Sequence, residues 1–278
     1  WGRLHPDLIL LFGDRYEQMA AAMASLPFAI PLAHIHGGER TQGAFDNQIR
    51  NALTKMSHLH FVAHRRHGTR VYRMGEEKWR IHVTGAPGID RIYARQPRTS
   101  ASWISLSAPR ILVTLHPCTL EYTHTVETVN ALSDALMDLK ASIVWTSANA
   151  DTYGSEINRT LEVYFGPPAV PTDAQYLDRM ADADVMVGNS SSGIIEAPSF
   201  RLPVVNIGRR QHGRLRGDNV IDVEPTSEAI RQGIARALDT RFREALTGEN
   251  PYGDGHAAER IAHILRTVPL DRRLLEKP

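Results

Sequence analysis

Acidic and basic residues that could act on a phosphorylated substrate follow two short apolar segments near the start of the chain. Asp14 and Arg15 come directly after the first segment, and Glu39 ends the HIHGGE letters of the second. Asp46 follows within a few residues. Paired carboxylates suit the removal and return of a proton, and arginines suit a phosphate leaving group. These residues therefore indicate acid–base chemistry at one edge of a sheet.

Some of these residues also have a purely structural interpretation. Asp14 could cap the helix that follows it, and Asp46 could be an acidic residue that gains from its place in a first helical turn. Asp46 and Arg50 could form only an ion pair across one turn. Glu39 differs, because the two glycines before it permit a close approach of the backbone to a ligand. Glu39 is therefore the strongest catalytic candidate.

The 13 histidines raise the question of a metal site. His34 and His36 are expected on one face of a strand, and His58 and His60 repeat this spacing. A zinc site would also need a third clustered ligand, and the spacings match no H-E-x-x-H pattern. We therefore predict no metal and interpret these histidines as hydrogen-bonding structural residues.

A second group of polar residues lies in the later half of the chain. The letters GNSSSG at 188–193 follow an apolar run and open a predicted helix, where hydroxyls and free backbone N–H groups favour an anion. An ordinary serine N-cap is the alternative interpretation. Glu196, one turn further, could accept both hydroxyls of a ribose. His116 ends another apolar run, just before Pro117, and this place at a strand end favours a functional role.

The elements that must position these residues alternate between apolar runs and helical segments. Strands are predicted at 7–12, 31–36, 60–63, 110–115, 141–146, 185–188 and 203–207, with helices at 16–26, 46–56, 125–140, 173–181, 226–238 and 257–266. This order is typical of parallel sheets with right-handed crossovers. Ligands of such sheets sit at the carboxyl ends of the strands, where the candidates fall.

The predicted fold is α/β with two Rossmann-like domains. Residues 1–95 are expected to form the N-terminal domain with the carboxylates, and residues 108–268 the second domain with the serine loop. The polar stretch between them is predicted to be a linker, and residues 269–278 a C-terminal tail. Because the chain begins at Trp1 and soon enters a buried strand, the first domain is expected to be incomplete at its start.

The composition narrows the classes of partner and compartment. The chain has 278 residues, 42% of them hydrophobic, and its 32 basic and 31 acidic residues leave a net charge of +1. This mixed charge argues against a nucleic-acid or membrane-surface protein. The single cysteine, Cys118, excludes an internal disulfide and a cysteine metal cluster. A reducing cytoplasm is therefore the expected location.

Read together, the motifs resemble one known family along nearly the whole chain. The matching segments are GDRYE (13–17), HIHGGERTQGAFDNQIRNALTKMSHLHFVA (34–63), VTGAPGID (83–90), TLHP (114–117), GNSSSGIIEAPSF (188–200), LPVVNIGRRQHGR (202–214) and NPYGDGHAAERI (250–261). They are similar to the hydrolysing UDP-N-acetylglucosamine 2-epimerases of sialic- and legionaminic-acid biosynthesis. The non-hydrolysing relatives carry different letters in place of HIHGGE.

The resemblance implies a GT-B-like fold that binds a UDP-sugar in the cleft between its domains. It implies conversion of UDP-N-acetylglucosamine, or of a 2,4-diacetamido analogue, to UDP and the free 2-epimeric sugar by elimination and hydration. This chemistry requires no redox or metal cofactor, and the family forms dimers or tetramers. The implied roles are catalytic for Asp14, Glu39 and Asp46, charge-stabilising for Arg15 and His116, phosphate-binding for Ser190 and Ser191, ribose-binding for Glu196, and nucleotide-binding for Arg210.

Two other functions fit parts of this pattern. A GT-B glycosyltransferase would use the same nucleotide site to pass the sugar to an acceptor, without carboxylates aimed at C2. A non-catalytic UDP-sugar-binding module is the second alternative. It is favoured by the start of the chain, where the T-G-T-R-A-E-Y-like loop of the family and about 80 residues of a usual first domain have no counterpart.

Overall fold

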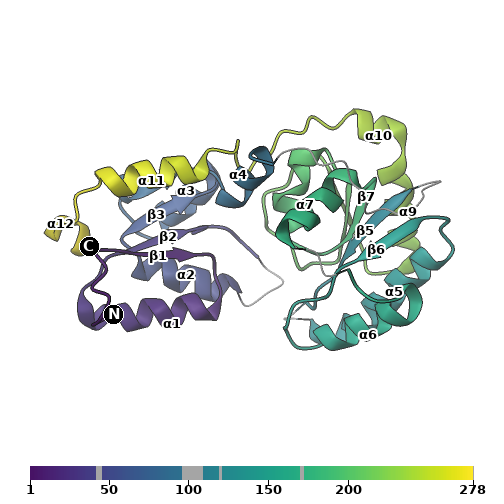
Figure 1. The fold of residues 1–278 in the computed structure, drawn as a ribbon, viewed down its shortest axis with the longest axis horizontal. Coiled ribbons are helices and arrows are strands. Elements are labelled where there is room, and N and C mark those ends of the chain that lie inside the picture. Colours follow the sequence, from purple (N-terminus) through teal and green to yellow (C-terminus); the bar gives the residue numbers. More distant parts are fainter. Residues whose placement is uncertain (42–45, 96–108, 119–120, 170–171, 278) are drawn as a thin grey trace. The chain divides into compact units, whose positions relative to one another are not determined.

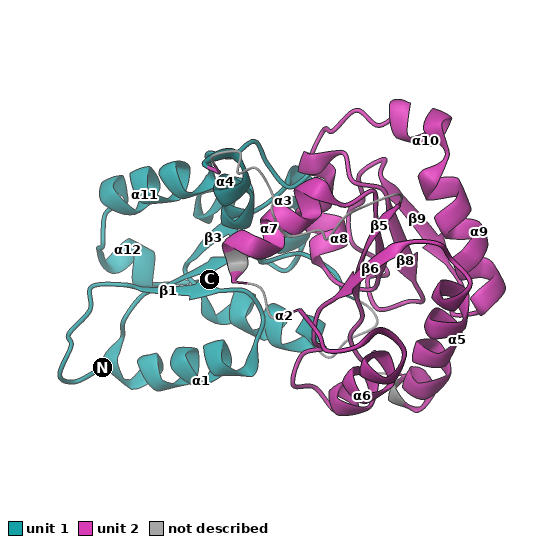
Figure 2. Cartoon of the chain, turned by 45° about the vertical axis from the view of Figure 1, so that its right-hand side comes forward, with its two compact units in different colours: residues 1–41, 45–94, 251–278 teal, residues 42–44, 95–250 magenta. Residues whose placement is uncertain are grey.

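The computed structural model describes residues 1–41, 46–95, 109–118, 121–169 and 172–277 (Figure 1). The chain divides into two compact units (Figure 2). Among the described residues, the first unit holds those within 1–41, 46–94 and 251–277, and the second holds those within 95–250. Each unit is built on its own parallel sheet, as the alternation of apolar runs predicts.

The first unit contains a sheet whose four described strands follow the chain order. The strands are β1 (Ile9–Phe12), β2 (Leu32–Ile35), β3 (Leu59–Val62) and β4 (Ile81–Val83), with the helices α1 (Tyr16–Ser25), α2 (Asp46–Met56), α3 (Arg65–Arg73) and α4 (Pro87–Tyr93) between or after them. The elements α3, β4 and α4 were not predicted from the sequence. The sequence of α3, RRHGTRVYR, has too few apolar residues to show a helical period, and β4 has only three residues.

The two faces of this sheet are covered by different helices. On one face Leu11 and Leu32 pack with Ala22 of α1 and Leu53 of α2. The opposite face buries an apolar set from β2 and β3 against two C-terminal helices, α11 (Ala257–Thr267) and α12 (Arg272–Leu275).

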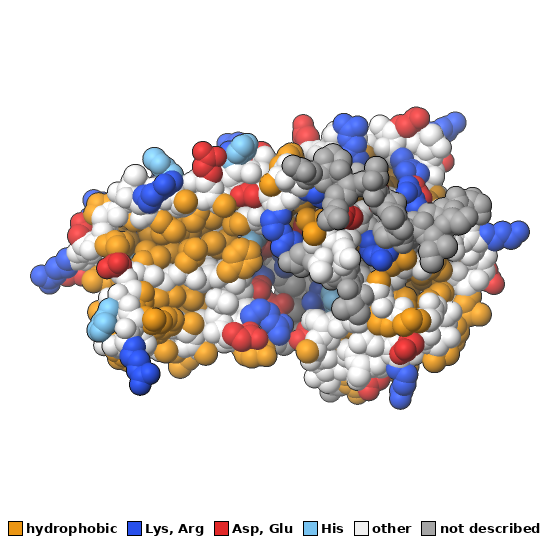
Figure 3. Space-filling model, viewed as in Figure 1, with side chains coloured by type: hydrophobic (Ala, Val, Ile, Leu, Met, Phe, Trp, Pro, Cys, Tyr) orange, Lys and Arg blue, Asp and Glu red, His pale blue; other side chains and the backbone are white. Residues whose placement is uncertain are grey.

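Strand β1 is covered less completely than its neighbours. Its side chains alternate between buried and exposed, and Leu10 and Phe12 are 44% and 52% exposed. They stand beside Ala33 and Ile35 in the parallel register, and both of these neighbours are buried. Hydrophobic side chains accordingly gather on the visible face of the first unit (Figure 3).

The C-terminal segment belongs to the first unit, although the sequence separates the two by the whole second unit. The backbone N–H of Ala86 donates to the carbonyl of Tyr252 at 2.7 Å, and Asp90 accepts from the N–H of Ala257 at 2.9 Å. The prediction that residues 251–268 complete the second domain, with 269–278 as a separate tail, is therefore wrong. The physical reason is that Ile261 and Leu274 are buried against the first sheet.

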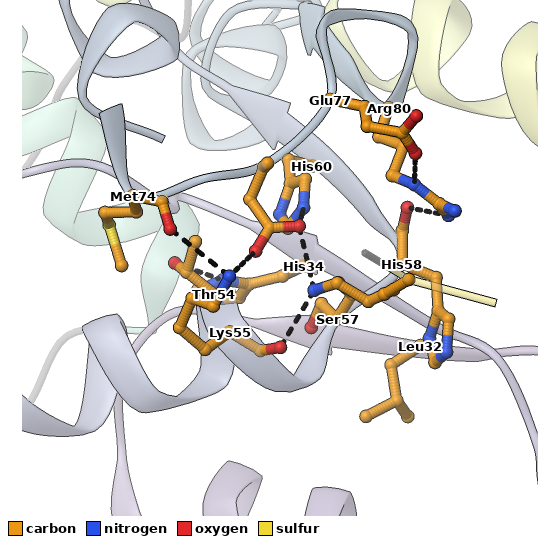
Figure 4. Close-up of polar contacts among 12 residues, drawn as sticks. Leu32, His34, Thr54, Lys55, Ser57, His58, His60, Met74, Glu77 and Arg80 are labelled. Atoms are coloured by element: carbon orange, nitrogen blue, oxygen red, sulfur yellow. Dashed lines mark hydrogen bonds and ion pairs between the residues drawn. The ribbon is translucent and has the colours of Figure 1, made fainter. Parts of the chain in front are cut away.

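Two buried charged residues tie the last helix to the first unit. The first, Arg80, donates to a carboxylate oxygen of Glu77 at 2.9 Å and to the carbonyl of His58 at 3.2 Å (Figure 4). Arg80 donates to the carbonyls of Arg273, Leu274 and Glu276 at 2.9, 2.7 and 2.7 Å, and thereby meets the open C-terminal end of α12.

The second buried charge is Glu76, which is bound by Lys55 at 2.7 Å, His60 at 3.0 Å and Lys277 at 2.8 Å. Burial acts to raise the pKa of Glu76, but these hydrogen bonds together lower it to about 2. Glu76 is therefore ionised, and it links the C-terminal segment to α2 and β3.

In the sheet of the second unit, successive strands are added first on one side of its first strand and then on the other. Its strands are β5 (Arg110–Thr114), β6 (Ser142–Trp145), β7 (Val185–Gly188), β8 (Val204–Ile207) and β9 (Val220–Val223), in the spatial order β6-β5-β7-β8-β9. From β5 the chain moves outward to β6 and then returns to β7 on the other side. The carboxyl ends of β5 and β7 therefore form a switch point, the usual ligand site of an open α/β sheet.

The helices of the second unit are α5 (Thr125–Met137), α6 (Gly154–Phe165), α7 (Asp173–Asp182), α8 (Ser192–Ile195), α9 (Ser227–Leu238) and α10 (Thr240–Glu244). Short 3-10 turns in the two units lie at Leu26–Phe28, Lys78–Arg80, Tyr122–His124 and Ala197–Phe200. The sequence analysis missed α6, β9 and α10. Over the described part of the chain, no helix has the length and apolar character needed to cross a bilayer.

The Arg80 contacts predict a local loss of stability. Replacing Arg80 by Met keeps an apolar stem but leaves three carbonyls of the C-terminal segment without their donor. We expect the first unit to lose about 2–4 kcal/mol of unfolding free energy. Hydrogen exchange of β3 and β4 should rise, while β5 and β7 stay protected. The control is Arg272→Met, because its ion pair with Glu276 is exposed. Equal exchange in both variants would contradict the interpretation.

Candidate functional site

A buried arginine gathers the polar residues that follow β1 and β2. Arg50, on α2, is 1% exposed. Its guanidinium forms an ion pair with Asp14 and donates to Thr41 Oγ1 at 3.0 Å and to the carbonyl of Glu39 at 3.1 Å. The alternative interpretation of Asp14 as a helix cap is wrong, because Arg15 is the N-cap of α1 and Asp14 forms an ion pair with Arg50. Asp14 and Glu39 are thus brought together by one side chain.

Glu39 is the most buried of the predicted carboxylates. Its side chain is 3% exposed, and Glu39 Oε1 lies 2.6 Å from His36 Nδ1. The backbone bends sharply before it, with φ values of 70° at His36 and 76° at Gly38. A Cβ at Gly38 would lie 2.3 Å from the carbonyl oxygen of His67, so only glycine fits there. The turn therefore fixes where the Glu39 carboxylate points.

His34 and His36 have different surroundings. The prediction that both lie on one strand face is wrong, because β2 ends at Ile35 and His36 is in the left-handed region. His34 Nε2 lies 2.7 Å from the carbonyl oxygen of Gly13. Burial lowers the pKa of His34 to about 4, although this carbonyl acts to raise it. His34 is therefore a neutral ring that joins the ends of β1 and β2.

The remaining predicted residues of the first unit are less enclosed. Arg15 is 41% exposed, and its Nε lies 3.8 Å from a carboxylate oxygen of Glu17. Asp46 is the first residue of α2 and is half-buried. Residues 42–45 of the matching motif lie outside the described residues. Thr41 was missed by the sequence analysis, and its position between Glu39 and α2 was the available signal.

In the second unit, His116 and Asn189 join the two strand ends at the switch point. The backbone N–H of His116 donates to Asn189 Oδ1 at 2.8 Å, and Asn189 Nδ2 donates to the carbonyl of His116 at 2.8 Å. Gly188 precedes this pair at φ 142°, and a Cβ there would lie 2.0 Å from the carbonyl oxygen of Thr114. The sequence analysis did not select Asn189. Its place directly after a strand-ending glycine was the signal.

The tautomer of His116 is fixed by a backbone donor. The N–H of Asn149 donates to His116 Nδ1 at 3.1 Å, so Nδ1 carries no proton and the ring proton is on Nε2. Burial and then the nearby Arg210 lower the pKa of His116 to about 4, against the opposite effect of Asp151. At neutral pH this ring is therefore neutral and can donate one hydrogen bond from Nε2.

The serine loop follows β7, but the helix after it is shorter than predicted. Helix α8 covers only Ser192–Ile195, and Glu196 lies at its C-terminal end, where a 3-10 turn begins. So short a helix has little macrodipole, and anion binding must depend on the loop itself. Ser190 is 9% exposed, and its Oγ lies 2.7 Å from Ser192 Oγ. Within the described residues, Ser191 makes no side-chain cap to this helix.

Basic residues after β8 lie beside the same loop. Arg210 Nη1 and Gln211 Nε2 donate to the carbonyl of Asn189 at 3.1 and 2.8 Å. A pocket of about 260 Å³ in this unit is lined by His116, Arg210 and Cys118, among others. His116, Arg210 and the serine loop thus lie together at the switch point.

The chain is similar to known epimerases. A family model described as UDP-N-acetylglucosamine 2-epimerase matches residues 1–266. The UDP-N,N'-diacetylbacillosamine 2-epimerase (hydrolyzing) of Legionella pneumophila is 39% identical over 284 residues, which cover 98% of this chain and 74% of that protein. The GDP/UDP-N,N'-diacetylbacillosamine 2-epimerase (hydrolyzing) of Campylobacter jejuni is 40% identical over 234 residues, covering 80% of this chain and 61% of that protein.

Solved structures share the architecture. The crystal structure of UDP-GlcNAc 2-epimerase from Neisseria meningitidis bound to UDP-GlcNAc matches with a TM-score of 0.81 at 19% identity, and the match covers 96% of this chain and 78% of that chain. This likeness confirms the predicted GT-B-like α/β fold. The chain spans 61–74% of the length of the two sequence relatives named above.

The neutral His116 predicts a pH-dependent stability of the second unit. Its pKa falls from 6.5 in the unfolded chain to about 4, so the unfolded chain binds the extra proton between these values. The folded state therefore has its full stability above the pKa of His116 in the unfolded chain. This stability falls as the pH is lowered toward the pKa of His116 in the folded protein. We expect His116→Gln to reduce the loss of unfolding free energy between about pH 7 and pH 5 by about 2 kcal/mol.

Hydrogen exchange of β5 and β7 in urea measures this effect in the second unit alone. The control is His124→Gln, because His124 is exposed and pairing with Glu127 raises its pKa instead. An unchanged pH slope in His116→Gln would show that the buried ring does not titrate as described.

Proposed function

Since this chain belongs to the UDP-N-acetylglucosamine 2-epimerase family, we propose that it is a hydrolysing 2-epimerase, which converts a UDP-sugar to UDP and the free 2-epimeric sugar. The observation that carries the proposal is the Glu39 carboxylate, buried after β2 and held 2.6 Å from His36. A buried carboxylate beside a histidine is suited to moving a proton. A homodimeric or homotetrameric state and a cytoplasmic location stay predictions.

The proposed substrate is the 2,4-diacetamido sugar nucleotide, UDP-N,N'-diacetylbacillosamine. The two relatives that carry this sugar in their names are 39% and 40% identical to the chain. The UDP-N-acetylglucosamine 2-epimerase of Neisseria meningitidis is 29% identical over 273 residues. This difference in identity supports the diacetamido sugar over UDP-N-acetylglucosamine.

In the proposed reaction the first unit handles protons at the sugar ring. Glu39, Asp14 and Asp46 are the candidate carboxylates. One carboxylate takes the C2 proton while the C1–O bond breaks, which releases UDP and leaves a 2-acetamidoglycal. Water then adds at C1, and C2 receives a proton on the opposite face. Arg50 holds Asp14 and the Glu39 backbone in fixed positions, so these groups need little rearrangement during the reaction.

The second unit is proposed to bind the nucleotide and stabilise the leaving group. His116 can donate from Nε2 to a diphosphate oxygen, because Asn149 occupies Nδ1. Arg210 supplies positive charge for the same group, and the hydroxyls of Ser190 and Ser191 donate hydrogen bonds to it. Arg15, in the first unit, is proposed to stabilise negative charge as well. Glu196 is proposed to bind the ribose hydroxyls.

Replacing Glu39 by Gln tests the carboxylate directly. The amide keeps the size of the side chain but removes its basicity, so we expect UDP release to fall at least about 100-fold while UDP still binds. Release is measured by a coupled UDP assay and binding by titration calorimetry. Glu17→Gln is the matched control, because Glu17 is an exposed carboxylate on α1. Wild-type UDP release from Glu39→Gln would remove the main support for the proposal.

Turnover in deuterated water tests the reaction type and the substrate together. Elimination and hydration place solvent deuterium at C2 of the freed sugar, because the C2 proton is exchanged in the process. Both UDP-sugars are incubated separately, and the products are identified by NMR. We expect UDP and a C2-deuterated 2-epimer, formed faster from the diacetamido substrate. A product without deuterium at C2 would instead indicate a transferase or simple hydrolysis.

A further inference from the structure

Five hydroxyl groups form a connected chain beneath the serine loop of the second unit. Thr146 Oγ1 donates to Thr114 Oγ1 at 3.0 Å, and Thr114 Oγ1 lies 3.4 Å from the Tyr176 hydroxyl. The Tyr176 hydroxyl lies 2.7 Å from Ser192 Oγ, which lies 2.7 Å from Ser190 Oγ. The chain runs from the ends of β5 and β6, through the first turn of α7, to the loop after β7.

We propose that Tyr176 is a positioning residue that turns the Ser190 hydroxyl outward as a donor to a phosphate of the bound nucleotide. This inference rests on the proposed function, in which the serine loop binds UDP. It adds a residue from another element, α7, whose side chain acts through Ser192 and does not itself touch the nucleotide.

Each hydroxyl has one proton to donate and two lone pairs that can accept. Ser190 Oγ accepts from the backbone N–H of Ser192 at 3.3 Å. If it also accepts from Ser192 Oγ, both of its lone pairs are used and only its own proton remains. A hydroxyl in that state can bind an acceptor, such as a phosphate oxygen. It has no lone pair left for a donor.

The Tyr176 hydroxyl determines which hydroxyl of the chain donates to which. Ser192 can donate to Ser190 when its oxygen accepts from the Tyr176 hydroxyl. Thr146 donates to Thr114, so the Thr114 proton is available for Tyr176 in the same sense. Each hydroxyl in such a chain strengthens the next, and an anion at the end aligns them all.

Local structure keeps Tyr176 in place and protonated. Its helix begins with a capping box, in which Thr172 and Gln175 satisfy each other's backbone N–H groups. Burial raises the pKa of the Tyr176 phenol above its ordinary value, so the group retains its proton at neutral pH. A phenylalanine would keep the ring but remove the hydroxyl. The Ser190 proton could then turn inward to Ser192, away from the ligand.

The test is a double-mutant cycle on the dissociation constant of UDP, measured by titration calorimetry with the whole chain. We expect Tyr176→Phe to weaken UDP binding about three- to tenfold, as for the loss of one hydrogen bond. In a Ser190→Ala background the same change should have less than about a twofold effect, since the donor it orients is gone. In turnover, Tyr176→Phe should raise KM more than it lowers kcat.

Thr146→Val provides a second, independent test at the far end of the chain of hydroxyls. Valine is nearly isosteric with threonine, and three hydroxyls separate Thr146 from Ser190. Thr146→Val should nevertheless weaken UDP binding. This effect should vanish in a Tyr176→Phe background. The matched control is Ser133→Ala, whose buried hydroxyl bonds only within α5 among the contacts described. Ser133→Ala should leave the dissociation constant unchanged.

The possible results separate the two proposals. If wild-type chain does not bind UDP, the proposed nucleotide site is wrong, and this inference falls with it. If UDP binds but Tyr176→Phe binds it equally well, or loses the same affinity with and without Ser190, the positioning role alone is wrong. If Tyr176→Phe does not fold, the Thr146→Val and Ser190→Ala pair decides the question.

Discussion

The polar edge of the first unit depends on the burial of one guanidinium. A buried cation is costly unless its N–H groups meet oxygen atoms, and Arg50 meets them on the loops after β1 and β2. Arg50 thereby holds the Asp14 carboxylate and the Glu39 backbone beside each other. In the second unit, the loops after two strands are held together by a neutral side chain. Asn189 bonds the backbone of His116 in both directions and joins two strand ends.

Much of the candidate site could be predicted, because strand ends are visible in the sequence. An apolar run followed by glycine and by charged or other polar residues locates Glu39, Asp14 and Ser190, and parallel strands bring such ends to one edge. The partners of these residues could not be predicted. That Arg50 binds Asp14 depends on how α2 packs on β1, and that Asn149 binds His116 depends on a loop after β6. Neither packing has a local signal in the sequence.

The fold class was predictable from the sequence, but the predicted division into domains was partly wrong. Residues 257–267 have a clear apolar helical face, but an apolar face fits any sheet that lacks a cover. The choice between the first and second sheet is made by long-range contacts such as Ile261 and Leu274 with β2 and β3, and by Arg80 with the C-terminal carbonyls. Chain order alone suggested the nearer unit. Short elements such as β4 were missed because three residues cannot establish a period.

The return of the C-terminal segment to the first unit has a consequence for how the chain folds during synthesis. Residues 95–250 form one continuous unit, which can fold as soon as they have left the ribosome. The first unit is begun earlier but lacks α11 and α12 until residues 257–275 have been made, after the whole second unit. Until then, the face of β2 and β3 that these helices cover is exposed to other chains. The strands β1 to β4 are therefore made before the second unit, and the helices that cover one of their faces are made after it.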